Sequence, residues 1–125
     1  MSIALWIAAV VLALAMLGAG SMKLIRTRDQ LVAMGMGYAA HLPQGLIKLI
    51  GALEVLAAIG LIVPALTGIA PILVPLAATG VAIIMVGAVI THVRLREPLG
   101  KSVPAIVLLL LALFVAWGRF GAYAF

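Results

Sequence analysis

The sequence predicts an all-α membrane protein, in which four transmembrane helices form an up-down-up-down bundle. Composition is the first reason: of 125 residues, 67% are hydrophobic and 9% are charged, whereas a soluble domain is about 25% charged. The second reason is the spacing of the apolar residues, which form runs of about 20, the length a helix needs to cross a hydrocarbon core of about 30 Å. At this length we expect one domain, residues 1–125.

The apolar runs give the expected spans: 3–22, 42–63, 72–91 and 103–121. The second and third runs are continuous, with no Lys, Arg, Asp or Glu between Glu54 and Arg94. Because a single helix of that length would exceed the bilayer, the chain must turn within the run. Residues 64–71 contain two prolines and a glycine, so we expect the turn there.

The connection at residues 23–43 is polar and long enough to hold a short helix of its own. Thr27 and Gln30 fit a capping box, in which each side chain bonds the other residue's backbone N–H. We therefore expect a short interfacial helix that begins after Thr27 and carries Leu31 along the membrane surface.

Charge predicts the orientation. Seven of the eight Lys and Arg residues lie in or near the loops 23–43 and 92–101, which such a bundle places on one side, and only Arg119 lies near the other side. The positive-inside rule then predicts cytoplasmic loops and two external termini. These loops also account for the net charge of +5, so we expect the lipid bilayer as partner and no nucleic acid.

Small residues suggest how the helices meet. In the third span they recur at spacings of three, four and seven, and we expect them to form a smooth face for close helix contact; these residues are Ala77, Gly80, Gly87, Ala88 and Thr91. In the fourth span Arg119 shares a face with three alanines, so we expect its side chain to point into the bundle.

Glu54 is the candidate functional residue, because it lies near the middle of the second span. A central charge costs about 2.5–3.5 kcal/mol or more in a membrane helix, so the carboxylate requires a partner or is protonated. Its position suits two roles equally. In a functional role it carries a proton or accepts a hydrogen bond from a ligand's hydroxyl or amine; in a structural role it ties helices together. Lys48 is six positions away, on a different face of the helix. Among Lys23, His92 and Arg119 on other helices, we favour Lys23 or Arg119 as the partner.

Other chemistry is limited. The chain has no cysteine, which excludes disulfides and thiolate ligands. His41 and His92 lack a nearby carboxylate pair, so we expect no metal site. A histidine and a buried acid can, however, hydrogen-bond the carbonyls of a quinone headgroup. The candidate ligand-binding residues are Glu54, Lys23, Lys48, His92, Arg119 and His41; no residue is assigned a catalytic role, and we expect no catalytic activity from this chain by itself.

Several short motifs resemble a known family. They are residues 18–23 (GAGSMK), 48–54 (KLIGALE) and 60–64 (GLIVP), followed by His92 with arginines and Glu97. This pattern is similar to the DoxX-like group of four-helix membrane proteins, with Lys23, Glu54 and His92 carrying the match.

The resemblance implies a multi-pass protein of the bacterial cytoplasmic (inner) membrane. The group is named for a subunit of a thiosulfate:quinone oxidoreductase, and other members are linked to oxidative-stress complexes or to assembly of membrane proteins. We therefore expect an accessory or quinone/lipid-site subunit of a membrane redox complex, with a polar site around Glu54. The alternatives are a non-enzymatic, chaperone-like assembly protein that holds partner helices, and a proton-coupled small-molecule transporter. Besides the bilayer, the expected partner is a second copy of the chain or a subunit of a membrane redox complex.

Overall fold

The computed structural model describes residues 2–33, 40, 42–98, 100, 102–121 and 124. In this part of the chain the secondary structure is entirely helical: α1 (Ser2–Ile25), α2 (Arg28–Ala33), α3 (Gln44–Thr67), α4 (Leu73–Arg94) and α5 (Val103–Phe120). All except α2 are long and apolar enough to cross a membrane. The predicted fold class, an all-α membrane bundle of four long helices with one short helix in the first loop, is confirmed.

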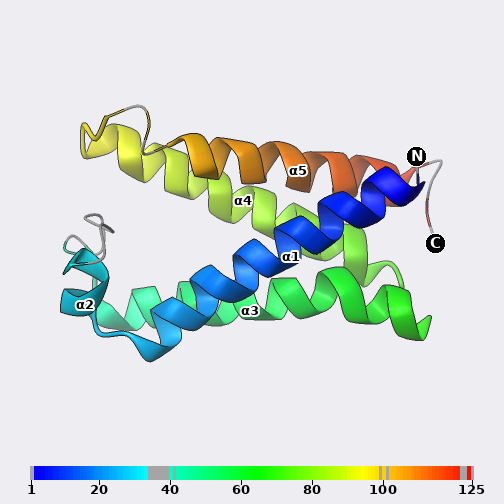
Figure 1. Ribbon diagram of the computed structural model, residues 1–125, viewed down its shortest axis with the longest axis horizontal. Coiled ribbons are helices and arrows are strands. Elements are labelled where there is room, and N and C mark those ends of the chain that lie inside the picture. The colour runs from blue at the N-terminus through cyan, green and yellow to red at the C-terminus, as the bar shows by residue number, and fades with distance from the viewer. Residues whose placement is uncertain are drawn as a thin grey trace.

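The long helices form a ring in the order α1, α3, α4, α5, with each helix packed against the next and α5 closing the ring on α1 (Figure 1). Successive long helices run in opposite directions. At one end, which we call the loop end, α1 and α4 finish and α3 and α5 begin. At the other, the terminal end, lie the start of α1, the end of α5 and the turn between α3 and α4.

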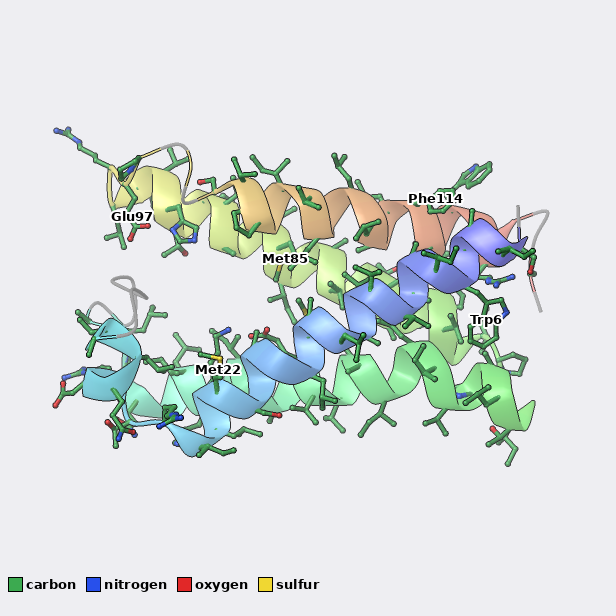
Figure 2. The ribbon with its side chains drawn as sticks, viewed as in Figure 1. Trp6, Met22, Met85, Glu97 and Phe114 are labelled. Carbon is green, nitrogen blue, oxygen red and sulfur yellow. The ribbon has the colours of Figure 1, made fainter. Side chains whose placement is uncertain are left out.

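Aliphatic side chains of all four long helices form the core. Leu12, Leu61, Val81 and Val115 are fully buried, and the buried side chain of Met85 lies toward the middle of the bundle (Figure 2). The outward faces are just as apolar. Leu14, Leu56, Ile83 and Leu110, one from each long helix, are more than 60% exposed. Apolar residues on both faces are what a helix requires when lipid replaces water around it.

The short helix α2 has the predicted start. The Thr27 N–H donates to Gln30 Oε1 at 2.9 Å, and the Gln30 N–H donates to Thr27 Oγ1 at 3.2 Å, which is a complete capping box. Leu31 of α2 is buried against Ile47 of α3, with Met22 and Leu42 beside them. Apolar packing therefore holds α2 against the loop end of the bundle.

The expected turn at residues 64–71 is shorter than predicted, because α3 continues through Pro64 to Thr67. Pro64 lacks the N–H that would bond the carbonyl four residues earlier, but membrane helices tolerate this loss. The helix instead ends at Gly68, whose φ of 70° is left-handed and whose N–H donates to the Pro64 carbonyl. Glycine adopts this conformation without steric cost.

The small-residue face of α4 is not used as predicted. A Cβ atom built on Gly80 or Gly87 would have no atom of another helix within 4 Å, so these two glycines do not mediate close helix contact. The tight contact of α4 lies nearer the terminal end, where Ala77 approaches Gly60 of α3. Gly87, Ala88 and Thr91 instead line a partly open cavity.

Candidate functional site

The backbones of α1 and α3 approach each other closely where the helices cross at Gly20 and Gly51. A Cβ atom on Gly20 would lie 2.7 Å from the Gly51 carbonyl oxygen, and one on Gly51 would lie 2.9 Å from the Gly20 carbonyl oxygen. No side chain fits between the two backbones. This crossing fixes the relative position of the residues that follow each glycine on its helix, Lys23 and Glu54.

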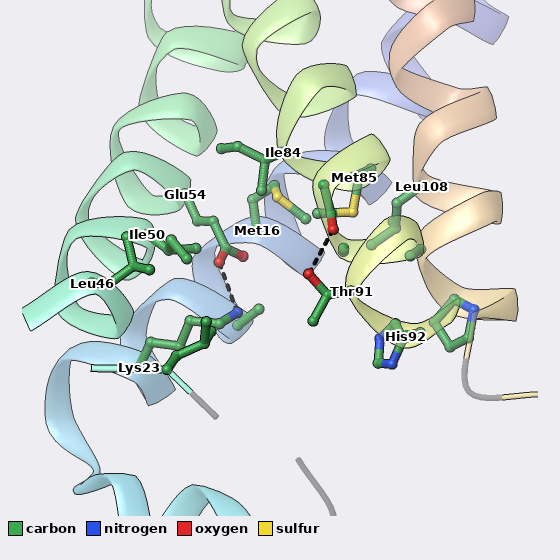
Figure 3. A pocket seen from close by; sticks show the side chains of 16 residues that line it. Met16, Lys23, Leu46, Ile50, Glu54, Ile84, Met85, Thr91, His92 and Leu108 are labelled. Carbon is green, nitrogen blue, oxygen red and sulfur yellow. Dashed lines mark hydrogen bonds and ion pairs between the residues drawn. The ribbon is translucent and has the colours of Figure 1, made fainter. Parts of the chain in front are cut away.

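Lys23 follows Gly20, and Glu54 follows Gly51, by three positions, so each side chain lies on the same helix face as its glycine. Because α1 and α3 are antiparallel and helical side chains lean toward the N-terminus of their own helix, the two side chains lean toward each other. The Lys23 Nζ atom donates to Glu54 Oε1 at 2.7 Å (Figure 3). The crossing of α1 and α3 thus creates an ion pair.

This ion pair is buried. Lys23 is 8% exposed and Glu54 is 1% exposed, and no buried side-chain nitrogen or oxygen in the described residues lacks a hydrogen bond. A buried charge is stable only when a partner compensates its lost hydration. Of the two favoured partners of Glu54, Lys23 is therefore the one that meets it.

The pair forms part of the wall of a partly open cavity of about 410 Å³ that is lined by residues of all four long helices. Ligand sites in proteins commonly measure about 300–1,000 Å³. Apolar side chains make up most of the remaining wall: Met16, Leu46, Ile50, Ile84, Met85 and Leu108. The cavity combines apolar walls with a few polar groups, which is the usual composition of a small-molecule site.

His92 lies on the cavity wall near the end of α4 (Figure 3). Its Nδ1 atom contacts Glu97 Oε2 at 2.5 Å, and the two side chains are 13% and 18% exposed. Thr91, the preceding residue, also lines the cavity, and its Oγ1 donates to the Gly87 carbonyl at 2.8 Å. The cavity therefore has an ion pair from α1 and α3 and a histidine from α4.

The other predicted site residues lie elsewhere. The Lys48 Nζ atom donates to the carbonyls of Leu24 at 2.5 Å and Arg26 at 3.4 Å, so Lys48 caps the end of α1 and does not pair with Glu54. Arg119 is buried at the terminal end, as predicted, with its guanidinium 6.0 Å from the Trp6 ring centroid. His41 lies outside the described residues.

Two elements of the site were missed by sequence reasoning. One is the glycine crossing, although the shared spacing of Gly20–Lys23 and Gly51–Glu54 was a visible signal. The other is Glu97 as the partner of His92, five positions away. In the described residues no group of His, Asp and Glu is arranged to hold a metal ion.

This fold and cavity define a multi-pass membrane protein with a largely apolar cavity among its four long helices. The chain belongs to the DoxX-like family, whose family model matches residues 7–115. The matched segment contains Lys23, Glu54, His92 and Glu97. Comparison with curated protein sequences and with solved structures gives no match.

Proposed function

We propose that this protein is an accessory subunit of a membrane redox complex and that its cavity holds the headgroup of a quinone. One observation carries the proposal: the Lys23–Glu54 pair lies in the wall of an otherwise apolar cavity of about 410 Å³. A quinone ring is a flat apolar body with an oxygen acceptor at each end, and it dissolves in the bilayer that surrounds the bundle.

The chemistry of the pair suits such an acceptor. An ionised carboxylate only accepts hydrogen bonds, whereas an ammonium has three N–H donors. Glu54 accepts a hydrogen bond from one N–H of Lys23 and so holds the ammonium at the cavity wall. A second donor can then reach a quinone carbonyl, and Glu54 can accept from the hydroxyl of the reduced form. The role of the protein in this proposal is binding; electron transfer belongs to a partner subunit.

A stability measurement tests the proposal. A ligand that binds only the folded state stabilises it by about 2.7 kcal/mol when present at 100 times its Kd. We expect a short-chain benzoquinone to raise the unfolding temperature of the purified protein in lipid nanodiscs, and to do so saturably. Glu54→Gln should weaken this effect about tenfold or more. Equal responses of wild type and Glu54→Gln would contradict the proposal.

Quinones also partition into lipid, so a steric control is required. Ala88→Trp places a large side chain in the cavity, whereas Val86→Trp places the same side chain on a 44% exposed position of α4 that is not part of the cavity wall. We expect Ala88→Trp to remove the benzoquinone response and Val86→Trp to keep it. Equal responses of these two variants would show that the quinone acts through the bilayer.

We also propose that the protein lies in the bacterial cytoplasmic membrane with its loop end in the cytoplasm. Arg26, Arg28, Arg94 and Arg96 all lie at that end, which supports the orientation through the positive-inside rule. The chain has no cysteine, so a single introduced cysteine is the only thiol that can react with a labelling reagent. Arg28→Cys should be shielded from an impermeant thiol reagent in intact cells and Ser2→Cys should react; the reverse pattern would overturn the orientation.

A further inference from the structure

Helices α3 and α4 diverge from the turn that joins them toward the loop end (Figure 1). Near the turn they touch, because a Cβ atom on Gly60 of α3 would lie 3.0 Å from the Cβ atom of Ala77 on α4. The two helices are antiparallel, so Ile50, ten residues before Gly60, lies level with Gly87, ten residues after Ala77. A Cβ atom on Gly87 would have no atom of another described helix within 4 Å. At this level the contact between α3 and α4 is therefore open.

This gap is continuous with the cavity. The cavity wall includes Leu46 and Ile50 of α3, and Ile84 and Gly87 of α4; Figure 3 shows the first three of these side chains. Leu46 is 40% exposed and Gly87 is also exposed, so these two residues border both the cavity and the outside of the bundle. The cavity thus opens sideways between α3 and α4, and we call the space between these four residues the α3–α4 opening.

The other sides of the cavity are more closed at this depth. The glycine crossing brings the backbones of α1 and α3 together. The wall residues that α1 contributes are buried or half-buried: Met16, Ala19 and Lys23. On α5 the exposed wall residue is Pro104, which lies in the first turn of that helix, at the loop end. The apolar way out of the cavity at membrane depth is therefore the α3–α4 opening.

We propose that the α3–α4 opening holds the hydrocarbon tail of a lipid-soluble quinone, while the ring of the quinone lies in the cavity beside Lys23 and Glu54. This inference rests on the proposed quinone site and deepens it. It defines the ligand as a quinone with a long tail that enters sideways from the bilayer, and it assigns Gly87 as the residue that keeps room for the tail.

The size of the cavity and the chemistry of the opening support this assignment. Ligand sites commonly measure about 300–1,000 Å³, and this cavity, at about 410 Å³, suits a ring but not a ring with a long tail. The tail must then leave the cavity. Leucine, isoleucine and glycine border the opening and offer it the same hydrocarbon surroundings as lipid chains do. Because Gly87 has no side chain, a larger residue at this position would reach into the path of the tail.

Two glycines of α4 provide a matched test. Gly80 and Gly87 are seven positions apart and so share a helix face, and a Cβ atom on either would have no atom of another described helix within 4 Å. Gly87 lines the cavity, whereas Gly80 is not part of its wall. Phenylalanine fits at both positions without a clash, but at position 87 its ring would occupy the space of the tail.

The measurement compares two quinones in nanodiscs of fixed lipid content, by the shift in unfolding temperature. We expect Gly87→Phe to weaken binding of a decyl-substituted benzoquinone about tenfold or more, because ring and tail overpack the same space, and to retain the response to short-chain benzoquinone. Gly80→Phe should bind both quinones as wild type does. Equal binding of the decyl quinone by the two variants, or equal loss of both quinones in Gly87→Phe, would overturn the proposal.

Photo-crosslinking tests the route in the unmodified protein. A decyl-benzoquinone that carries a diazirine in the middle of its tail should label residues 46–53 of α3 and 83–90 of α4. Excess unlabelled decyl-benzoquinone should remove these labels, whereas labels from quinone dissolved in the lipid persist. Labels that the competitor removes from residues 11–18 of α1 or 106–113 of α5, in place of α3 and α4, would refute the α3–α4 opening as the path of the tail.

The two proposals fail differently. If Ala88→Trp leaves the benzoquinone response unchanged, there is no quinone site and both proposals fall. If Ala88→Trp removes that response but Gly87→Phe and Gly80→Phe bind the decyl quinone equally well, the quinone site stands and only the place of the tail is refuted.

Discussion

Removing Lys23 should cost far more than removing an ordinary lysine. Lys23→Met leaves the carboxylate of Glu54, 1% exposed, without the ammonium that lies 2.7 Å away. Breaking a buried pair in this way costs about 3–5 kcal/mol. Glu54 lies deep in α3 and its short side chain cannot reach water, so we expect Lys23→Met to lower the free energy of unfolding by about 3–4 kcal/mol.

The opposite substitution should cost less. Glu54→Met strands the ammonium of Lys23, but a lysine near a helix end can extend its side chain to the interface, and Lys23 lies two residues before the end of α1. We expect a loss of about 1–2 kcal/mol. The double variant replaces the pair by two apolar side chains and should lie within about 1 kcal/mol of wild type, since such replacements are often neutral.

Reversible unfolding in mixed micelles, followed by circular dichroism, measures all four proteins. The values above give a coupling free energy of at least about 3 kcal/mol between Lys23 and Glu54. Lys48→Met is the matched control, because it removes a lysine at the same end that does not contact Glu54. Lys48→Met and Glu54→Met should be additive within about 0.5 kcal/mol. Additivity of Lys23→Met and Glu54→Met would refute the buried ion pair.

The same unfolding measurement tests the helix contacts and helix ends around the site. Gly20→Ala should cost about 1–3 kcal/mol, because its Cβ would lie 2.7 Å from a backbone oxygen, whereas Gly18→Ala, with nothing within 4 Å, should be neutral or stabilising; equal effects would rule out the tight crossing. Arg96→Gly should stabilise by about 0.5–1 kcal/mol, since glycine accepts the left-handed φ of 55° without strain; destabilisation would contradict this left-handed end of α4. Lys48→Met should cost about 1 kcal/mol by removing the hydrogen bonds that cap α1, and an unchanged stability would show that these bonds contribute nothing.

The fold could be predicted because lipid imposes a simple rule on the chain. A helix that crosses a bilayer must be apolar for about 20 residues, and this signal depends on composition and length alone. Arg119 was also correctly placed inside the bundle, because the alanines that share its helix face mark the side that packs. Pro64 was misjudged because proline ends most helices in water, whereas α3 continues through it.

The site was harder to predict because it depends on which helices cross and where. Glu54 stood out as a lone carboxylate, but the choice between Lys23 and Arg119 required the depth of the α1–α3 crossing. That depth is set by the close approach of Gly20 and Gly51. Glu97 was missed for a different reason: its approach to His92 depends on a left-handed arginine, and arginine rarely adopts that conformation.

The Lys23–Glu54 pair is not explained by stability alone. An apolar pair of similar volume would hold α1 against α3 about as well as the ion pair does, and the glycine crossing already fixes the two helices. What an apolar pair could not provide is a set of charged hydrogen-bonding groups in the wall of the cavity. The same reasoning applies to His92 and Glu97. The Glu97 N–H donates to the His92 carbonyl and the Arg96 N–H to the Val93 carbonyl, which is a Schellman motif, and a hydrophobic contact frequently joins these two positions of the motif. In both places a polar pair occupies positions that apolar side chains could fill, and the cavity is lined by both members of the first pair and by His92 of the second. This coincidence favours a bound ligand with polar groups over a purely structural role for either pair.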